Sequence, residues 1–479
     1  MTSDAPAPVG LETRPSLPGT LFTEQAGGEV NAGLDLRAVP SYKSPLKIGR
    51  SNSVSVSSEA TEGDSGARSD SEEGTVEGGG AMEKRGRFRP ATECVLVESH
   101  PSVHDPYRAS STPLYITATF KQSSATEMGE YDYSRSGNPT RTQLELHLAK
   151  LMSAHRSFAL SSGMSALDVI TRLVRAGEEV VAGDDIYGGT QRLLTFLATH
   201  SAVTVHHCDT TKVSSVIPHL SPRTRLVLLE TPTNPLLKIV DLRAIVAAVR
   251  QHAPSAVVVV DNTMMSPYLQ RPLELGADIV YHSGTKYLSG HHDLMAGVVG
   301  VRSEDLARQI AFVVNATGCA LPPFDCFLLM RGVKTLAVRM DRQQRNAGRI
   351  AAFLDGLRTA DGSRVLPSVF YPGLPGHPGK EVHDAQSEGA GAVLSFTTGS
   401  VEKSTKVVEG TRIFGISVSF GCVNSLISMP CHMSHASIPA HLRAARALPE
   451  DLIRLCVGIE DVQDLIEDLE GALRAAGVI

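Results

Sequence analysis

A short apolar run ends in a lysine in the stretch Gly276-Ala277-Asp278-Ile279-Val280-Tyr281-His282-Ser283-Gly284-Thr285-Lys286. Its first seven residues read as a buried strand, and a lysine that stays charged and unpaired at the end of such a strand is costly. Condensation with an aldehyde removes the charge, and small hydroxyls beside the amine can hold a phosphate. Pyridoxal 5′-phosphate (PLP) carries both groups. The stretch therefore predicts that Lys286 is a Schiff-base lysine; the alternative is a surface lysine in a polar loop.

The composition bounds the class of protein. The chain has 479 residues, 42% of them hydrophobic and 20% charged, which is enough for two or three globular domains. A net charge of -6 gives no reason to expect nucleic acid or a membrane surface as partner, and no apolar run approaches the length of a membrane helix. Seven scattered cysteines, an odd number without C-x-x-C spacing, fit reduced thiols in an intracellular enzyme.

The N-terminal part differs from the rest. Residues 1–90 are predicted to be a disordered tail, because residues 51–81 are almost all Ser, Glu, Gly, Asp and Thr and lack apolar periodicity. The chain start lacks a basic region followed by an apolar one, so a cytoplasmic location is expected, with organelle targeting as the minority interpretation. Residues 91–147 are interpreted as an extended N-terminal arm that runs into a helix from Thr140.

Strands and helices alternate after the arm. Continuous apolar runs of strand length at residues 225–229 and 256–260 predict buried parallel strands. Further strands are expected at 157–160, 179–182, 203–206 and 296–301, and their alternation with helices predicts a parallel sheet covered by helices on both faces. This predicts an α/β fold with a PLP-binding large domain at 148–345, whose ligands bind at the carboxyl ends of the strands.

The C-terminal residues 346–479 are predicted to form a smaller α+β domain. A single long helix is expected at about 326–357 and a closing amphipathic helix at 460–476. Strands are expected at 393–397 and 426–428.

Asp261 follows four consecutive valines, 25 residues before Lys286. That distance fits one strand-helix-strand excursion, so both side chains are expected at the same crevice. A carboxylate there keeps the pyridine nitrogen of PLP protonated and the ring an electron sink. A helix cap or an Asx turn is the alternative for Asp261.

Two further loops follow predicted strands. Ser162-Gly163-Met164 opens a helix, whose free N–H groups and positive end suit a phosphate, although a simple glycine turn fits equally well. Tyr187 lies in a loop where it can stack on the pyridine ring, with a buried loop tyrosine as the alternative. No metal site is expected. Adjacent histidines such as His206-His207 and His291-His292 point to opposite faces of a strand, and no third ligand is evident.

Together these features resemble the cysteine/methionine-metabolism family of PLP enzymes, the γ-family of fold type I (aspartate-aminotransferase-like). The resemblance runs from about Asp105 to the C-terminus. Its motifs are Tyr131-Asp132-Tyr133-Ser134-Arg135-Ser136-Gly137-Asn138-Pro139-Thr140, Ser161-Ser162-Gly163-Met164-Ser165-Ala166, Glu230-Thr231-Pro232-Thr233-Asn234-Pro235, Val260-Asp261-Asn262-Thr263, Ser283-Gly284-Thr285-Lys286-Tyr287-Leu288-Ser289-Gly290-His291 and Arg454-Leu455-Cys456-Val457-Gly458-Ile459-Glu460. One departure is Gly284, where the family usually has alanine.

The resemblance implies roles for residues that the physical reasoning does not reach. Tyr133 and Arg135 would hold the cofactor phosphate of a neighbouring subunit, in a homotetramer of two catalytic dimers. The phosphate cradle within the chain would comprise Ser162, Gly163, Met164, Ser283 and Thr285. The substrate α-carboxylate would be clamped by Arg454, a task that suits its planar fork, with help from Ser419 and Asn234.

The region from Ser419 to Pro430 resembles plant and fungal cystathionine β-lyases, including Ser-Leu-Ile-Ser-Met-Pro at 425–430. The family's γ-lyases and γ-synthases usually carry glutamate where this chain has Asn424. The resemblance thus implies β-elimination of L-cystathionine to homocysteine, pyruvate and ammonia in methionine biosynthesis. Lys286 would act as general base, with Lys286 or Tyr187 protonating the leaving sulfur. The alternatives are a cystathionine γ-lyase or γ-synthase and, in a different class, an inactive PLP-binding regulatory homologue.

Overall fold

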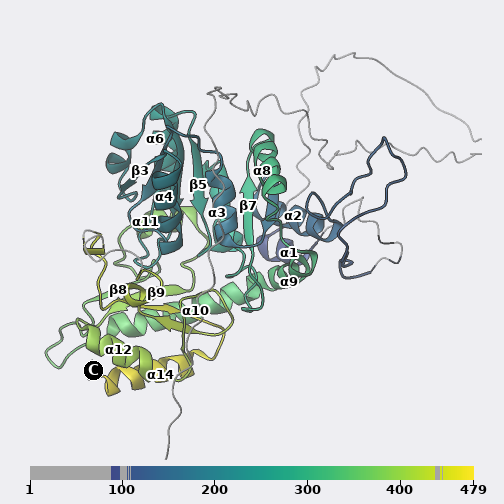
Figure 1. Cartoon of the computed structure of the whole chain (residues 1–479). Helices are drawn as coiled ribbons and strands as arrows, with labels where there is room; N and C mark the ends of the chain where they lie inside the picture. Colours follow the sequence, from purple (N-terminus) through teal and green to yellow (C-terminus); the bar gives the residue numbers. More distant parts are fainter. Residues whose placement is uncertain (1–87, 98–104, 106, 108, 437–442, 445) are drawn as a thin grey trace, which may run out of the picture. The chain divides into compact units, whose positions relative to one another are not determined.

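The computed structural model describes residues 88–97, 105, 107, 109–436, 443–444 and 446–479 (Figure 1). The tail predicted at residues 1–90 falls outside the described residues except for its last three. Within the described part of the chain, no helix combines the length and apolarity needed to cross a bilayer.

A seven-stranded sheet forms the centre of the large domain, in the order β1-β7-β6-β5-β4-β2-β3. The strands are β1 Arg156–Leu160, β2 Glu179–Gly183, β3 Thr204–Cys208, β4 Thr224–Glu230, β5 Val257–Asp261, β6 Ile279–Ser283 and β7 Gly297–Val301. All neighbours are parallel except that β7 runs antiparallel to both β1 and β6. The prediction of a mostly parallel sheet is therefore confirmed.

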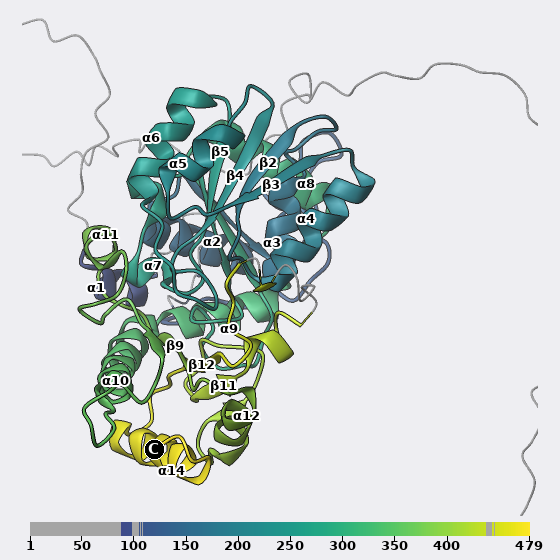
Figure 2. The same cartoon turned by 90° about the vertical axis from the view of Figure 1, so that its left-hand side faces the viewer.

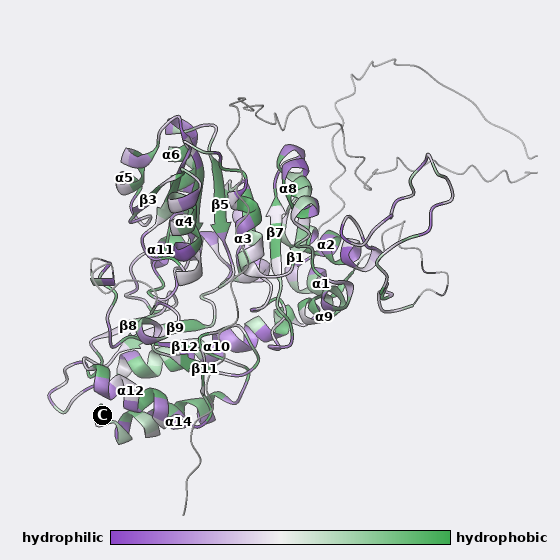
Figure 3. Cartoon of the chain, in the orientation of Figure 1, coloured by the Kyte–Doolittle hydropathy of each residue, from purple (hydrophilic) through white to green (hydrophobic). Residues whose placement is uncertain are grey.

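Apolar residues on both faces of this sheet explain its burial. In β5, Val257 and Val259 join one hydrophobic cluster, whereas Val258 and Val260 join another, because successive side chains point to opposite faces. One face is covered by α3 Gly163–Thr171, α4 Gly188–His200 and α8 Glu304–Thr317, and the other by α2 Pro139–Met152, α6 Leu242–His252 and α7 Ser266–Leu269. Figure 2 shows α4 and α6 on opposite sides of the strands, and Figure 3 shows β5 in the green of hydrophobic residues.

Short helices complete the large domain. They are α1 Pro90–Val95, α5 Val213–Val216, α9 Pro323–Val333 and the 3-10 turns η1 Ile217–His219 and η2 Pro272–Leu275.

The C-terminal domain contains a second sheet of five strands in the order β10-β11-β12-β9-β8. Its strands are β8 Ser368–Phe370, β9 Val393–Thr397, β10 Gly415–Ile416, β11 Leu426–Ser428 and β12 Ile453–Cys456. The accompanying helices are α10 Leu336–Gly356, α11 Lys380–Gln386, α12 Val401–Gly410, α14 Val462–Ala475 and the turn η3 Pro430–His432. The predicted strands at 393–397 and 426–428 and the closing helix are confirmed.

The prediction of a single long helix at about 326–357 is wrong, because the chain turns between α9 and α10. Thr335 closes this turn with two hydrogen bonds to the Gly332 carbonyl oxygen, one from its N–H and one from its hydroxyl, both 3.1 Å. Gly332 packs so closely on the segment after Lys286 that an added Cβ would lie 2.4 Å from the Ser289 carbonyl oxygen. Both helices have apolar faces, so the periodicity of the sequence did not reveal this break.

Residues 109–138 run without regular helix or strand and form the blue loop to the right of α2 in Figure 1. Helix α2 begins immediately afterwards, where the Asn138 side chain accepts a hydrogen bond from the Thr140 N–H at 3.0 Å. The arm predicted at 91–147 is therefore extended only in part, because α1 and the first turns of α2 lie within it. The predicted division between 345 and 346 falls inside α10, which continues across it.

Candidate active site

Lys286 follows β6 in a turn closed by a hydrogen bond from its N–H to the Ser283 carbonyl oxygen (3.1 Å). Its Nζ donates a hydrogen bond to the Ser419 hydroxyl at 2.6 Å and lies 5.1 Å from the centre of the Phe420 ring. Burial, followed by the nearby Arg454 guanidinium, lowers the pKa of Lys286 to about 8. Its amine is therefore neutral far more often than that of an exposed lysine, as covalent bonding to an aldehyde requires.

Three polar side chains stand side by side on β4, β5 and β6, the first two of them on the last residue of their strand. Glu230 is the register partner of Asp261, which in turn pairs with Tyr281. Asp261 Oδ1 accepts hydrogen bonds from the N–H (2.9 Å) and hydroxyl (2.5 Å) of Thr263. Burial raises the pKa of the Asp261 carboxyl despite these bonds. A cationic ring nitrogen beside Asp261 would hold this carboxyl in its charged form.

The start of α3 packs against the end of β6. The Ser162 hydroxyl caps the helix by accepting a hydrogen bond from the Ser165 N–H at 3.0 Å. An added Cβ at Gly163 would lie 2.9 Å from the Ser283 Cβ. The residues predicted for a phosphate cradle, Ser162, Gly163 and Ser283, are thus brought together by the fold, and only glycine permits this approach.

Thr285 lies beside the cradle, but its hydroxyl bonds to the backbone of Ala296. It accepts from the Ala296 N–H at 3.0 Å and lies 3.3 Å from the Ala296 carbonyl oxygen. The same neighbour explains the glycine at 284, since an added Cβ there would lie 2.9 Å from the Ala296 Cβ. Glycine is therefore sterically suited to position 284 in this chain.

Tyr187 precedes α4 and keeps 39% of its surface exposed. Its ring passes so close to Gly189 that an added Cβ there would lie 2.4 Å from a ring carbon, and 3.0 Å from the Met164 sulfur. The fold thereby brings Tyr187 next to Met164 at the start of α3, with a free ring surface available for stacking.

Arg454 is the most unusual charged group of the site, because it is only 2% exposed. Its Nη1 donates to Asn234 Oδ1 at 3.0 Å, and its Nη2 donates to the carbonyl oxygens of Val418 (3.1 Å) and Ser419 (3.0 Å). Burial lowers its pKa. Among the described residues, its Nε has no hydrogen-bond partner and no acidic side chain pairs with it. A buried guanidinium of this kind is suited to receiving an anion.

Phe420 connects the two cationic groups. Its ring centre lies 5.1 Å from Lys286 Nζ and 5.6 Å from Arg454 Cζ. Amine and guanidinium therefore lie near the same aromatic ring, and both bond to Ser419, so they face one region of the site.

Tyr133 and Arg135 lie apart from this group. The Arg135 guanidinium stands 5.0 Å from the centre of the Tyr133 ring, and its Nε donates to Asn315 Oδ1 of α8 at 3.4 Å. Within the described part of the chain, no hydrogen bond or ion pair joins either residue to the other candidates. The single chain thus gathers every predicted site residue except these two.

Several residues that contact the predicted site residues were not predicted from the sequence. Glu230 belongs to one of the family motifs, and an acid at the end of a buried strand is the same signal that indicates Asp261, yet no role is predicted for it from the sequence. Phe420 gave no local signal. His435 gave none either, and its Nε2 lies 3.2 Å from the Asn234 carbonyl oxygen.

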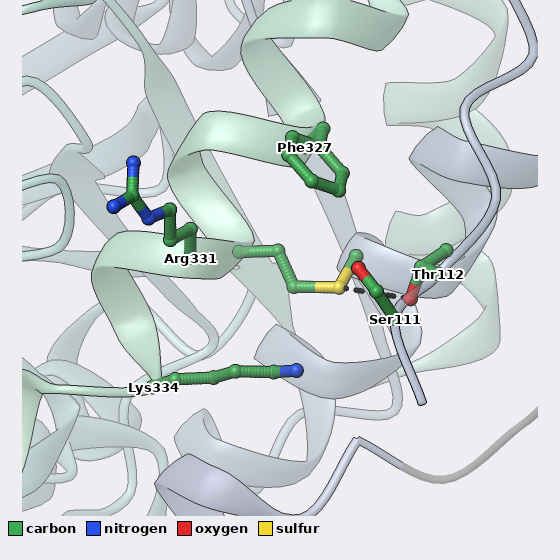
Figure 4. A pocket seen from close by; sticks show the side chains of 6 residues that line it. Ser111, Thr112, Phe327, Arg331 and Lys334 are labelled. Carbon is green, nitrogen blue, oxygen red and sulfur yellow. Dashed lines mark hydrogen bonds between the residues drawn. The ribbon is translucent and has the colours of Figure 1, made fainter. Parts of the chain in front are cut away.

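A hollow elsewhere lies between the arm and α9 (Figure 4). It has a volume of about 270 Å³ and is lined by Ser111, Thr112, Phe327, Met330, Arg331 and Lys334. None of the candidate residues borders it. In the part of the chain that the structure describes, no group of three His, Cys, Asp or Glu side chains is placed to hold a metal ion.

The fold matches solved PLP enzymes of fold type I. A cystathionine γ-lyase from Lactobacillus plantarum, solved with L-serine, superimposes with a TM-score of 0.76 at 35% identity, covering 81% of this chain and 100% of that chain. The arrangement of Lys286, Asp261 and the α3 start fits a PLP site, and the predicted fold class is confirmed.

The chain belongs to the Cys/Met metabolism PLP-dependent enzyme family, whose profile matches residues 92–474. Its cofactor is PLP. A cystathionine β-lyase of Neurospora crassa is 60% identical over 393 residues, which cover 82% of this chain and 83% of the relative. A chloroplastic cystathionine β-lyase of Arabidopsis thaliana is 53% identical over 80% of this chain and 81% of its own length. The family resemblance inferred from the motifs is therefore confirmed.

Proposed function

We propose that this chain is a cystathionine β-lyase that converts L-cystathionine to homocysteine, pyruvate and ammonia as a step of methionine biosynthesis. The observation that carries the proposal is the buried Arg454, without an acidic partner among the described residues, beside the amine of Lys286. This pair suits an α-amino acid. Relatives with 60% and 53% identity are cystathionine β-lyases, whereas the γ-lyase structure is 35% identical, which supports β- over γ-cleavage.

Each part of PLP has residues that would hold it. Lys286 would bind its aldehyde carbon, Asp261 its ring nitrogen, and Tyr187 the face of its ring. The phosphate would be held by Ser162, Gly163, Met164, Ser283 and Thr285, and by Tyr133 and Arg135 of a second copy. When bound, PLP withdraws electrons from the substrate Cα and makes its proton acidic.

The chain's own side chains then handle the substrate. Arg454, supported by Ser419 and Asn234, holds the α-carboxylate, so that the Cα–H bond faces Lys286. The Lys286 amine, freed when the substrate amine takes its place at the aldehyde and with its pKa lowered to about 8, would accept the Cα proton. The bond between Cβ and sulfur would break, and Lys286 or Tyr187 would donate a proton to the homocysteine sulfur. Water would then hydrolyse the remaining three-carbon fragment to pyruvate and ammonia.

The products of cystathionine cleavage test the proposal. Pyruvate with homocysteine supports β-cleavage, whereas 2-oxobutyrate with cysteine indicates the γ-lyase that is the nearest alternative. Absence of any keto acid from protein that holds PLP indicates an inactive homologue. The exposed Asn424 favours the β-lyase, because the family's γ-enzymes usually carry glutamate at this position.

The assembly and location are part of the proposal. A homotetramer of two catalytic dimers would let Tyr133 and Arg135 of one copy complete the site of another. Light scattering of the purified chain checks the mass, and a monomer with full activity contradicts the shared site. A cytoplasmic location is proposed for this chain, and imaging of the tagged full-length chain tests it.

Replacing Gly163 with alanine is expected to weaken PLP binding about 10-fold, because overpacking typically costs 1–3 kcal/mol. The added Cβ would lie 2.9 Å from the Ser283 Cβ and push α3 away from the cradle. Titration of the apoprotein with PLP, followed by absorbance, measures the dissociation constant. Gly471 of α14 has open space around it, so G471A is a matched control that should leave PLP binding unchanged. Unchanged affinity in G163A contradicts the assignment of the cradle.

Labelling of Lys286 in the apoprotein by formaldehyde and cyanoborohydride is expected to reach half its maximal rate at about pH 8, following the lowered pKa. Only the neutral amine attacks an aldehyde, so the rate rises as pH rises through this value and levels off above it. At pH 8 an ordinary lysine is neutral about 100-fold less often. Mass spectrometry of the peptide that contains Lys286 gives the profile. A rate that still rises steeply at pH 10 contradicts the lowered pKa.

A further inference from the structure

Glu230, the last residue of β4, connects two loops of the site. It is 7% exposed. Its Oε2 accepts a hydrogen bond from the Tyr187 N–H at 3.2 Å, and its Oε1 accepts one from the Asn234 N–H at 2.8 Å. Tyr187 and Asn234 lie 43 residues before and 4 residues after it. A single carboxyl therefore fixes the backbone of both loops.

A second contact joins the same loops. The Thr233 hydroxyl donates to Asp185 Oδ2 at 2.5 Å, and both residues are buried. The Tyr187 loop and the Asn234 loop are consequently linked twice. A shift of one loop must strain or break hydrogen bonds to the other.

Asn234 carries the effect onward to the candidate carboxylate clamp. Its side-chain oxygen accepts from Arg454 Nη1 at 3.0 Å, and its carbonyl oxygen lies 3.2 Å from His435 Nε2. The Arg454 guanidinium is thus oriented by a residue whose own backbone is held by Glu230.

We propose that Glu230 is a positioning residue that sets the cofactor ring contact and the substrate carboxylate clamp together. It does so by holding the Tyr187 loop and the Asn234 loop with its two carboxyl oxygens. The inference rests on the proposed function of Tyr187 and Arg454 in binding PLP and an amino acid. In this role Glu230 acts through the two loops and takes no part in the bond-breaking steps.

The surroundings of Glu230 are consistent with this role. Burial, followed by the neighbouring Asp261 and Asp185, raises the pKa of Glu230 well above its usual range. The backbone N–H groups of Tyr187 and Asn234 act in the opposite direction, because their hydrogen bonds to Glu230 favour the charged carboxyl.

The test compares E230Q with a matched control, E179Q. Glutamine keeps the shape but places an NH₂ group against one of the two backbone N–H groups, so one link is lost. Glu179 is equally buried (4% exposed) but lies at the opposite end of the sheet, where it bonds Ser221 and Arg223. The measurements are the unfolding midpoint of each apoprotein, its PLP dissociation constant, and KM and kcat for total keto acid released from L-cystathionine.

E230Q is expected to raise the PLP dissociation constant and KM together, each about 10-fold, with a smaller change in kcat. E179Q should change neither constant more than about 2-fold, because substitutions at distant sites that share no partners act independently. A change in the unfolding midpoint of E230Q with wild-type binding constants overturns the proposal, since it indicates a purely structural role. A change in only one of the two constants also overturns it, because the loops are then not coupled.

If E230Q does not fold, E230D provides the same test, since it keeps the carboxyl but is too short to reach both N–H groups. Raised constants in E230D support the proposal, and wild-type constants overturn it. Total keto acid is counted so that the bond cleaved does not matter. Release of 2-oxobutyrate instead of pyruvate would defeat the proposed β-lyase function and leave the Glu230 inference standing.

Discussion

Replacing Lys286 with alanine is expected to lower kcat for cystathionine cleavage by at least about 10³-fold. The substitution removes both the proposed covalent attachment of PLP and the amine that accepts the Cα proton, and general base catalysis by one side chain typically contributes 10²–10⁴-fold. The Nζ position is specific, 2.6 Å from the Ser419 hydroxyl and beside the Phe420 ring, so no other described lysine can replace it.

Turnover and the site of borohydride-trapped PLP are the two measurements for K286A. Wild-type protein should carry the trapped adduct on the peptide that contains Lys286, and K286A should carry none. Lys406, which pairs with Glu402 on the exposed face of α12, is the matched control, and K406A should retain both adduct and turnover. An adduct on another lysine, or full turnover in K286A, rules out the mechanism.

Replacing Arg454 with alanine is expected to lower kcat/KM by about 100-fold or more. Truncating one partner of a buried, hydrogen-bonded charge pair costs about 2–5 kcal/mol, and the substrate carboxylate is the proposed partner here. R454K keeps the charge but loses the planar fork, so about a 10-fold loss is expected even in this variant. The loss should appear mainly in KM.

The absorbance of bound PLP should be nearly normal in both Arg454 variants, because Lys286 and the cradle remain. Arg250, which pairs with Asp278 at 2.6 Å near the start of β6, is the control, and R250K should keep wild-type kinetic constants. Unchanged KM in R454A would show that the α-carboxylate binds elsewhere.

The large domain could be predicted from the sequence because its signals are local. Four consecutive valines before Asp261 fill both faces of the sheet, and this burial makes the segment a central strand. Parallel strands end at a common edge, so Asp261 and the turn with Lys286 had to lie near each other. The resemblance of the motifs to the family then assigned Arg454 and Asn234 to the binding of the substrate carboxylate.

Other features depend on contacts between distant residues. The turn at Thr335 exists because Gly332 must pack on the backbone at Ser289, a contact with no trace in the helical periodicity. The antiparallel direction of β7 likewise follows from its pairing with β6 and β1. Local sequence patterns indicate which residues are buried, but they do not indicate which distant residues these pack against.

The sequence by itself determined an α/β sheet with Lys286 and Asp261 at one edge, because burial and strand direction depend on near neighbours. The tertiary structure decided that Lys286 and Arg454 both lie beside Ser419 and the Phe420 ring, and that Glu230 holds two loops at once. These contacts join segments tens to hundreds of residues apart, and only the packing of the folded chain brings such segments within hydrogen-bonding distance.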